Sequence, residues 1–185
     1  MRTFEEDLQK ALNFHGHLCI GQVLGTRIAR LGLMQFGITE PEKYKDLIIY
    51  VESDRCLADA VSAVCGCSLG RRRLKWIDYG KMAAVFYDIQ TKCSYRIFNH
   101  KRITPEKGED IIAFYNQYSD EELFSIQEVK LNITEFDLPG KPIISVCCEG
   151  CKEKVMDNRH VTLDGKNYCR HCADRSKYYR VLRVE

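Results

Sequence analysis

The sequence predicts an α+β core domain over residues 1–139 and a small zinc-binding domain over residues 145–185. Amphipathic helical patterns lead the chain, and segments rich in aromatic and β-forming residues follow them. Two Cys-x-x-Cys pairs lie near the C-terminus, as in small domains built around a metal. Between the two parts, Pro139-Gly140-Lys141-Pro142 has the composition of a linker.

Composition excludes several classes of protein. The chain has 185 residues, of which 45% are hydrophobic and 29% charged, which is typical of globular domains. No apolar run approaches the roughly 20 residues that a bilayer crossing needs. The N-terminus is acidic and lacks the apolar segment of a signal peptide, so we expect a cytoplasmic protein without a membrane partner. A net charge of +2 gives little reason to expect a nucleic-acid partner.

The first helix is predicted from a capping box. Thr3 is followed three residues later by Glu6, and an apolar stripe begins at Phe4. The helix is expected to stop near Asn13 and to deliver residues 14–19 as a turn.

A second amphipathic helix is expected from Ile20 to Gly32 or Gly37. Gly25 lies inside this pattern, where it lowers helix propensity. We therefore expect Gly25 to pack closely against another backbone.

The rest of the core alternates between strand and helix signals. Residues 47–51 read as a buried strand, and Asp54 is expected to cap a third helix that ends at Cys65. Further elements are predicted as paired strands at 82–89 and 95–98 with Cys93 in the core, a helix opened by Thr104-Pro105, a short helix capped by Ser119, and a last strand over 126–133.

The C-terminal cysteines form two knuckles with zinc-ligand spacing. Zinc favours four soft ligands in a tetrahedron, and each knuckle supplies two thiolates. The segment between the knuckles contains Asp164-Gly165, a tight-turn signal for a hairpin. Cys147 adjoins the first knuckle and remains an alternative ligand. The predicted zinc ligands are Cys148, Cys151, Cys169 and Cys172.

A second cluster of metal-ligating residues lies in the predicted turn. His15, His17 and Cys19 fall within five residues, and Gly16 permits unusual backbone angles between the histidines. The following helix should favour the thiolate of Cys19 through its N-terminal dipole. The cluster is a candidate metal site or nucleophile.

The third helix adds further candidates. Cys56 lies at the helix start, where the dipole again favours thiolate, and Asp59 is one turn further on. Cys67 lies beyond the helix in a glycine-flanked loop that could bend back. The sequence therefore favours one core metal site shared by His17, Cys19, Cys56 and Cys67, although each cysteine alone could simply be packed.

A basic run follows the third helix. Arg71, Arg72, Arg73 and Lys75 could help to hold an anion near Gly66 and Gly70, although a solvated face is the commoner role for such a run.

Several ordered motifs resemble those of the formylmethanofuran dehydrogenase E-subunit family. They are FHGHLCIG at residues 14–21, CLADA at 56–60, GCSLG at 66–70 and DYGKMA at 78–83. Members of that family can carry a C-terminal zinc finger of treble-clef or ribbon type. Ile20 departs from the family pattern, which usually has proline there, and Arg71–Arg73 replace a mixed stretch.

The resemblance implies an α+β core, a homodimer and a metal-associated pocket for a small-molecule ligand. The second metal would be zinc or another transition metal. Lys81 is expected to face this pocket. His15, Asp59 and Lys81 would act as proton donors or orienting groups. The family is named after a molybdenum or tungsten enzyme complex that reduces carbon dioxide onto methanofuran.

Three functions are compatible with these motifs. The first is a metal-dependent oxidoreductase, or a component of one, in one-carbon metabolism related to methanogenesis. The second is an accessory module whose zinc finger docks a larger oxidoreductase. The third, ranked last because of the modest net charge, is nucleic-acid binding by the finger and its basic tail, which comprises Arg170, Arg175, Lys177, Arg180 and Arg183.

Overall fold

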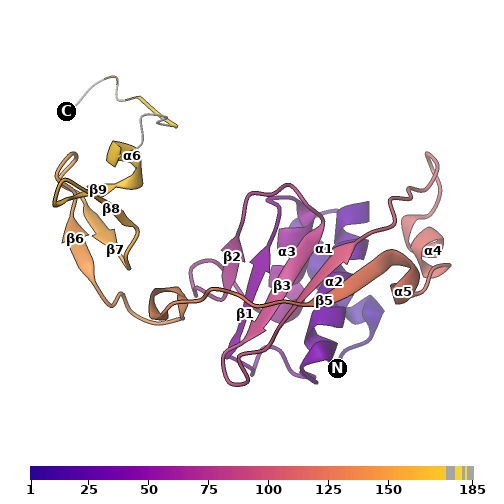
Figure 1. Cartoon of the computed structure of the whole chain (residues 1–185). Helices are drawn as coiled ribbons and strands as arrows, with labels where there is room; N and C mark the ends of the chain where they lie inside the picture. Colours follow the sequence, from indigo (N-terminus) through magenta and orange to yellow (C-terminus); the bar gives the residue numbers. More distant parts are fainter. Residues whose placement is uncertain (174–177, 181, 183–185) are drawn as a thin grey trace. The chain divides into compact units, whose positions relative to one another are not determined.

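A computed structural model describes residues 1–173, 178–180 and 182 (Figure 1). The chain divides into two compact units, Met1–Asn132 and Ile133–Glu185. The linker sequence at residues 139–142 falls within the second unit. Three basic residues of the predicted C-terminal tail, Arg175, Lys177 and Arg183, lie outside the described residues. None of the described helices is both long enough and apolar enough to cross a bilayer.

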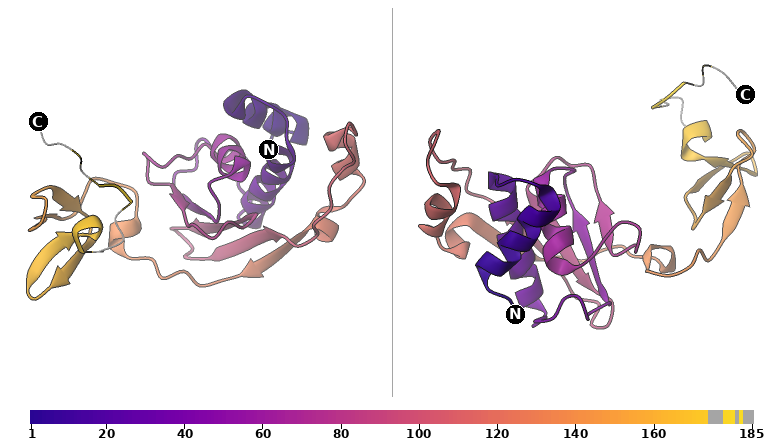
Figure 2. Two further views of the ribbon diagram at one scale, coloured as in Figure 1. Left: turned by 90° about the horizontal axis from the view of Figure 1, so that it is seen from above. Right: turned by 180° about the vertical axis from the view of Figure 1, so that it is seen from behind.

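The first unit is a five-stranded sheet with three helices on one face (Figure 2). The helices are α1 (Phe4–His15), α2 (Ile20–Gln35) and α3 (Cys56–Cys65). Their apolar sides meet the sheet in a core that includes Ile28, Val61 and Phe86. The predicted α+β architecture is confirmed.

The sheet has the order β2-β1-β3-β4-β5. β1 pairs with β2 in parallel, and the connection between them contains α3; the other pairs are antiparallel. The strands are β1 (Leu47–Val51), β2 (Leu74–Trp76), β3 (Ala83–Asp88), β4 (Ser94–Asn99) and β5 (Phe124–Glu128).

The capping box of α1 forms as predicted. The Glu6 backbone N–H donates to Thr3 Oγ1 at 3.2 Å, and the Thr3 N–H donates to the Glu6 carboxylate at 2.8 Å. The helix runs two residues further than Asn13 and ends at Gly16, whose φ is +94°. His15 therefore occupies the last turn of α1 rather than a free turn, and the left-handed Gly16 redirects the chain after it.

α2 and α3 cross at very short distance. A Cβ at Gly25 would lie 2.7 Å from the Cβ of Ala60 and 3.2 Å from the Cα of Leu57, so only glycine fits without a shift. This confirms the expected close backbone approach. One turn earlier, a Cβ at Gly21 would lie 2.7 Å from the Cβ of Cys56. The crossing thus brings the N-terminal turns of both helices together.

Some predicted boundaries are wrong. Asp54 does not cap α3, whose N-cap is Arg55 without a side-chain hydrogen bond. No helix begins at Thr104-Pro105; Gly108, at φ +92°, interrupts that segment. The next helix is α4 (Ile111–Asn116), because the Asp110 carboxylate accepts from two backbone N–H groups of its first turn. A side-chain oxygen with free N–H groups ahead of it decides the start of a helix.

Two further expectations concern the ends of the core unit. Ser119 caps α5 (Asp120–Leu123) with a complete capping box, as predicted. The last strand, β5, begins and ends earlier than the predicted residues 126–133. Cys93 is exposed in the turn between β3 and β4 rather than in the core, where Lys92 has a φ of +60°.

The second unit contains two short hairpins. β6 (Ser145–Cys147) pairs with β7 (Lys154–Met156), and β8 (His160–Leu163) pairs with β9 (Lys166–Cys169). The turn at Asp164-Gly165 has positive φ at both residues, as the predicted hairpin requires. A 3-10 helix, η1 (Glu135–Asp137), opens the unit, and α6 (Arg170–Ala173) follows β9.

Candidate metal centres

The C-terminal unit brings four sulfur atoms together. The sulfurs of Cys148, Cys151, Cys169 and Cys172 all lie within 4.8 Å of one another. The first two come from the turn between β6 and β7, and the last two from the junction of β9 with α6. Such a closed set of four cysteines is the ligand set of a structural zinc site.

Electrostatics explains why this sulfur cluster needs a cation. The backbone N–H of Cys169 lies 3.2 Å from the Cys148 sulfur, and this hydrogen bond is the main cause that lowers the pKa of Cys148 to about 6. The pKa of Cys172 is raised, above all by the neighbouring sulfur of Cys169. Adjacent thiolates repel one another, and a divalent cation at their centre removes that repulsion.

The geometry distinguishes between the two adjacent cysteines of the first knuckle. Cys148 is buried within the cluster, whereas Cys147 is exposed and its thiol donates to the Lys152 carbonyl at 3.2 Å. Gly150 closes the knuckle tightly: a Cβ there would lie 2.8 Å from the Cys172 sulfur. The structure thus places Cys148, and not Cys147, in the ligand set.

A second group of possible ligands lies at the junction of α1 and α2. The ligand atoms of His15, His17 and Cys19 lie within 4.8 Å of one another. His15 ends α1, Cys19 is the N-cap of α2, and the left-handed Gly16 between the histidines lets their rings approach to 4.5 Å. The Nε2 atom of His15 lies 3.9 Å from the Cys19 sulfur.

Asp59 on α3 fixes the orientation of His15. Its Oδ2 lies 2.8 Å from His15 Nδ1, so Nε2 is the nitrogen that remains available to a metal. A histidine that ligates a metal commonly donates its other N–H to a carboxylate in this way. The sequence predicted both residues as proton-handling or orienting groups; the geometry makes His15 a candidate ligand and Asp59 its positioning carboxylate.

Cys56 lies beside Cys19 through the crossing of α2 and α3. Burial is the main cause that raises the pKa of Cys56, and its hydrogen bond with Cys19 raises it further. The direction is opposite to the one expected from a helix N-terminus. Cys56 is thus adjacent to the group formed by His15, His17 and Cys19.

Cys67 does not join these residues. It lies beyond the far end of α3, a ten-residue helix about 15 Å long, whereas Cys56 begins that helix. Cys67 is 3% exposed, and burial raises its pKa to about 12. It belongs to the hydrophobic core.

The basic run after α3 has a structural component. Arg73 is 4% exposed, and its guanidinium donates to the carbonyls of Tyr44 at 2.7 Å, Leu47 at 3.2 Å and Gly66 at 3.3 Å. It ties the start of β1 to the loop after α3 and is not available to an anion. Arg71 is exposed.

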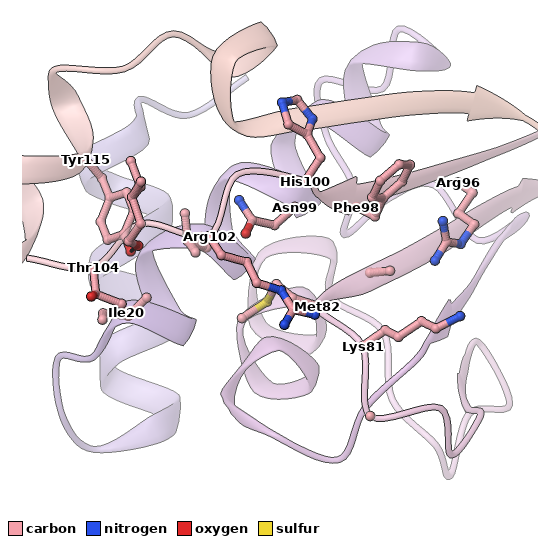
Figure 3. A pocket seen from close by; sticks show the side chains of 14 residues that line it. Ile20, Lys81, Met82, Arg96, Phe98, Asn99, His100, Arg102, Thr104 and Tyr115 are labelled. Atoms are coloured by element: carbon pink, nitrogen blue, oxygen red, sulfur yellow. Dashed lines mark hydrogen bonds between the residues drawn. The ribbon is translucent and has the colours of Figure 1, made fainter.

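A cavity of about 830 Å³ opens next to the α1–α2 junction (Figure 3). Ile20, the residue directly after Cys19, forms part of its wall, and Lys81 also lines it. Lys81 therefore faces this cavity rather than the group of histidines and cysteine. Arg102 from the segment after β4 also lines the cavity. No local pattern in the sequence pointed to Arg102, because the cavity wall is assembled from separate segments.

Comparisons with known proteins agree with the two-unit organisation. The family model described as "FmdE, Molybdenum formylmethanofuran dehydrogenase operon" matches residues 14–133. The model of the prokaryotic dksA/traR C4-type zinc finger matches residues 142–178. The first match contains the candidate metal group at the α1–α2 junction, and the second contains all four clustered cysteines.

One curated relative and one solved structure are similar over nearly the whole chain. A protein of Archaeoglobus fulgidus, named a probable S-adenosyl-L-methionine-binding protein, is 27% identical over 203 residues. That match covers 95% of this chain but only 54% of the relative. The crystal structure of an FmdE-like protein of tungsten formylmethanofuran dehydrogenase, from Syntrophus aciditrophicus, matches with a TM-score of 0.58 and 22% identity, covering 96% of each chain. At that identity the likeness supports the shared fold.

Proposed function

The chain belongs to the FmdE family, and we propose that its core binds a transition metal, zinc in the first instance, through His15, His17 and Cys19. In this proposal the metal serves one-carbon or related carbonyl redox chemistry on a small molecule in the adjoining cavity. The C-terminal zinc finger binds its own, structural zinc.

The convergence of two imidazoles and a thiol carries the proposal. Their ligand atoms come from the end of α1, the loop and the start of α2, and all lie within 4.8 Å. Two nitrogen ligands and one sulfur suit zinc, and three protein ligands leave a fourth position for water or substrate. A zinc ion with such an open position polarises a carbonyl or activates a water molecule.

The surrounding residues support a site that is held ready for a metal. Asp59 holds His15 at 2.8 Å through Nδ1, which leaves Nε2 as the available nitrogen. Cys56, next to Cys19, is the candidate for a fourth ligand and would close the site if it ligated. An open position with Cys56 unbound favours catalysis, and a closed His₂Cys₂ site favours a structural role.

Elemental analysis of the full-length protein tests the metal proposal. We expect about two metal ions per chain, one in each unit, and about one in Cys19→Ser or His17→Ala. Cys93→Ser is the matched control, because Cys93 is exposed in a turn between strands. Unchanged metal content in both core variants would refute the core site.

The relative from Archaeoglobus fulgidus supplies a second candidate function, the binding of S-adenosylmethionine. The volume of the cavity supports it, since about 830 Å³ is ample for a ligand of that size. The lining argues against it, because no carboxylate is among the described residues that line the cavity to face a sulfonium cation. Equilibrium dialysis with labelled S-adenosylmethionine separates the candidates: saturable binding that Lys81→Gln does not weaken would favour the second.

The zinc finger supports a docking role. We propose that it carries the core to a larger oxidoreductase and that the chain otherwise forms a homodimer. Co-purification with the full-length protein, but not with a Cys151→Ser, Cys172→Ser double variant, is the expected result. Steeply salt-dependent binding to RNA or DNA would instead favour nucleic acid as the partner.

A further inference from the structure

We infer that the cavity beside the α1–α2 junction binds an anionic small molecule whose carboxylate or phosphate is held by Lys81 and Arg102. Its apolar part would lie against Met82, Phe98 and Tyr115. The inference deepens the proposed function and rests on it for the identity of the reacting centre. The anion site itself follows from the charges and the shape of the cavity.

The charges that line the cavity are of one sign. Lys81, Arg96 and Arg102 all contribute, and no aspartate or glutamate does so among the described residues. Arg96 is neutralised, because Glu52, 5% exposed, accepts from it at 2.6 and 2.8 Å. The two remaining cations are therefore those of Lys81 and Arg102.

Neither of these two cations has an ion-pair partner among the residues that the structure describes. The Lys81 ammonium lies over the Tyr79 ring, 5.3 Å from its centroid, and no described carboxylate pairs with it. By contrast, Arg27 and Arg30 on α2 are each tied to a carboxylate and to backbone carbonyls. An arginine that lines a concave site without a partner is free to bind a carboxylate or phosphate through its planar fork.

The rest of the wall describes the body of the ligand. Ile20, Met82, Phe98 and Tyr115 supply apolar and aromatic surface, and Figure 3 draws them together with Lys81 and Arg102 around one cavity. A volume of about 830 Å³ lies in the range of pockets that hold drug-sized ligands. A lone one-carbon unit would leave most of that space to water. We therefore expect a larger acid or phosphate that carries the reacting group.

The position of Ile20 links the cavity to the metal group. Ile20 lines the cavity and directly follows Cys19 in the first turn of α2. An anion near Lys81 would anchor one end of the ligand, and the other end would lie towards Cys19. Binding energy from the remote anion can then orient the reacting group.

Titration of small aromatic probes into the full-length protein, followed by NMR, tests the anion site. Benzoate and phenyl phosphate are the anionic probes, and benzyl alcohol is the uncharged control. We expect each of Arg102→Gln and Lys81→Gln to weaken the better anionic probe about tenfold, the effect of about 1.4 kcal/mol. Benzyl alcohol should change less than about twofold. Arg71→Gln, which removes an exposed arginine outside the cavity lining, should leave all three affinities unchanged.

The two anionic probes separate the sources of the charge. Tighter binding of phenyl phosphate supports a phosphate-bearing ligand, and tighter binding of benzoate supports a carboxylic acid. The inference is overturned if neither anion binds, if benzyl alcohol binds as tightly as both, or if Arg71→Gln weakens binding as much as Arg102→Gln.

Repeating the titration with Cys19→Ser separates this inference from the proposed function. Cys19 is not among the residues that line the cavity, so the anionic probes should still bind. If they bind while the metal content of the core is zero even in the unmutated protein, the anion site stands and the metal proposal fails. If the core holds its metal and the anions do not bind, the reverse holds.

Discussion

The Nδ1 atom of His15 and the Oδ2 atom of Asp59 lie 2.8 Å apart, although 44 positions separate the two residues in the chain. This contact joins the end of α1 to the first turn of α3. It fixes which imidazole nitrogen faces Cys19, and it therefore joins the fold to the proposed chemistry of the site.

Asp59→Asn should weaken metal binding at the core site by about 10- to 100-fold, because the imidazole loses the carboxylate that orients it and raises its basicity. Competition with a chelator, measured on protein whose finger site is loaded, gives the affinity. Asp54→Asn is the matched control, since Asp54 is exposed and precedes α3. Equal affinities of the two variants would remove Asp59 from the site.

Gly25→Ala should lower the free energy of unfolding by about 1–3 kcal/mol, because the added methyl overlaps Ala60 and the α3 backbone. Urea denaturation of both proteins gives the difference. Gly70→Ala meets nothing within 4 Å and should have little effect. A Gly25→Ala variant as stable as the parent would mean that α2 and α3 are not packed this closely.

Gly150→Ala should empty the zinc finger while leaving the core metal bound. The new Cβ would lie 2.8 Å from the Cys172 sulfur and 3.7 Å from that of Cys148, inside the space of the ligand shell. Elemental analysis should give about one metal ion fewer per chain. Glu149→Ala, in the same knuckle but exposed, should retain the full content. Loss of metal in both variants would point to general unfolding of the unit.

Tyr44→Phe should destabilise the protein at neutral pH but much less in acid. Burial raises the pKa of Asp88, but hydrogen bonds from Tyr44 at 2.6 Å and from Thr91 lower it by more, so the net pKa is below the ordinary value. The stabilisation is present above the unfolded pKa of about 3.9 and is lost as the pH falls through the lower folded value.

The expected loss for Tyr44→Phe at pH 7 is about 1.5–3 kcal/mol, the usual contribution of a hydrogen bond to a charged group. The fluorescence of Trp76, the one tryptophan of the chain, follows unfolding of the core unit. A difference between the two proteins that stays constant from pH 7 to about pH 3 would contradict the assignment of the bond to the ionised Asp88.

Local signals predicted much of the fold. The capping boxes at Thr3 and Ser119 depend on residues three positions apart, and both formed as expected. The hairpin turn at Asp164-Gly165 is also a local property. Lys92 carries a positive φ without glycine, so no turn residue in the sequence marked Cys93 as part of a turn.

The composition of the core site depended on tertiary structure. Cys56 and Cys67 looked equivalent in the sequence because each lies near an end of α3. The length of that helix separates them, and only the crossing at Gly21 and Gly25 decides that Cys56 is the one beside Cys19. Arg102 belongs to no motif, and only the assembled cavity reveals it.

X-ray absorption at the zinc edge tests the core metal centre most directly, on the full-length Cys151→Ser, Cys172→Ser variant, whose finger can no longer hold its metal. We predict bound zinc with a mixed set of ligands: nitrogen at about 2.0–2.1 Å from His15 and His17, and sulfur at about 2.3 Å from Cys19. A protein without zinc, or zinc bound by oxygen and nitrogen alone, would contradict a core metal centre at the α1–α2 junction.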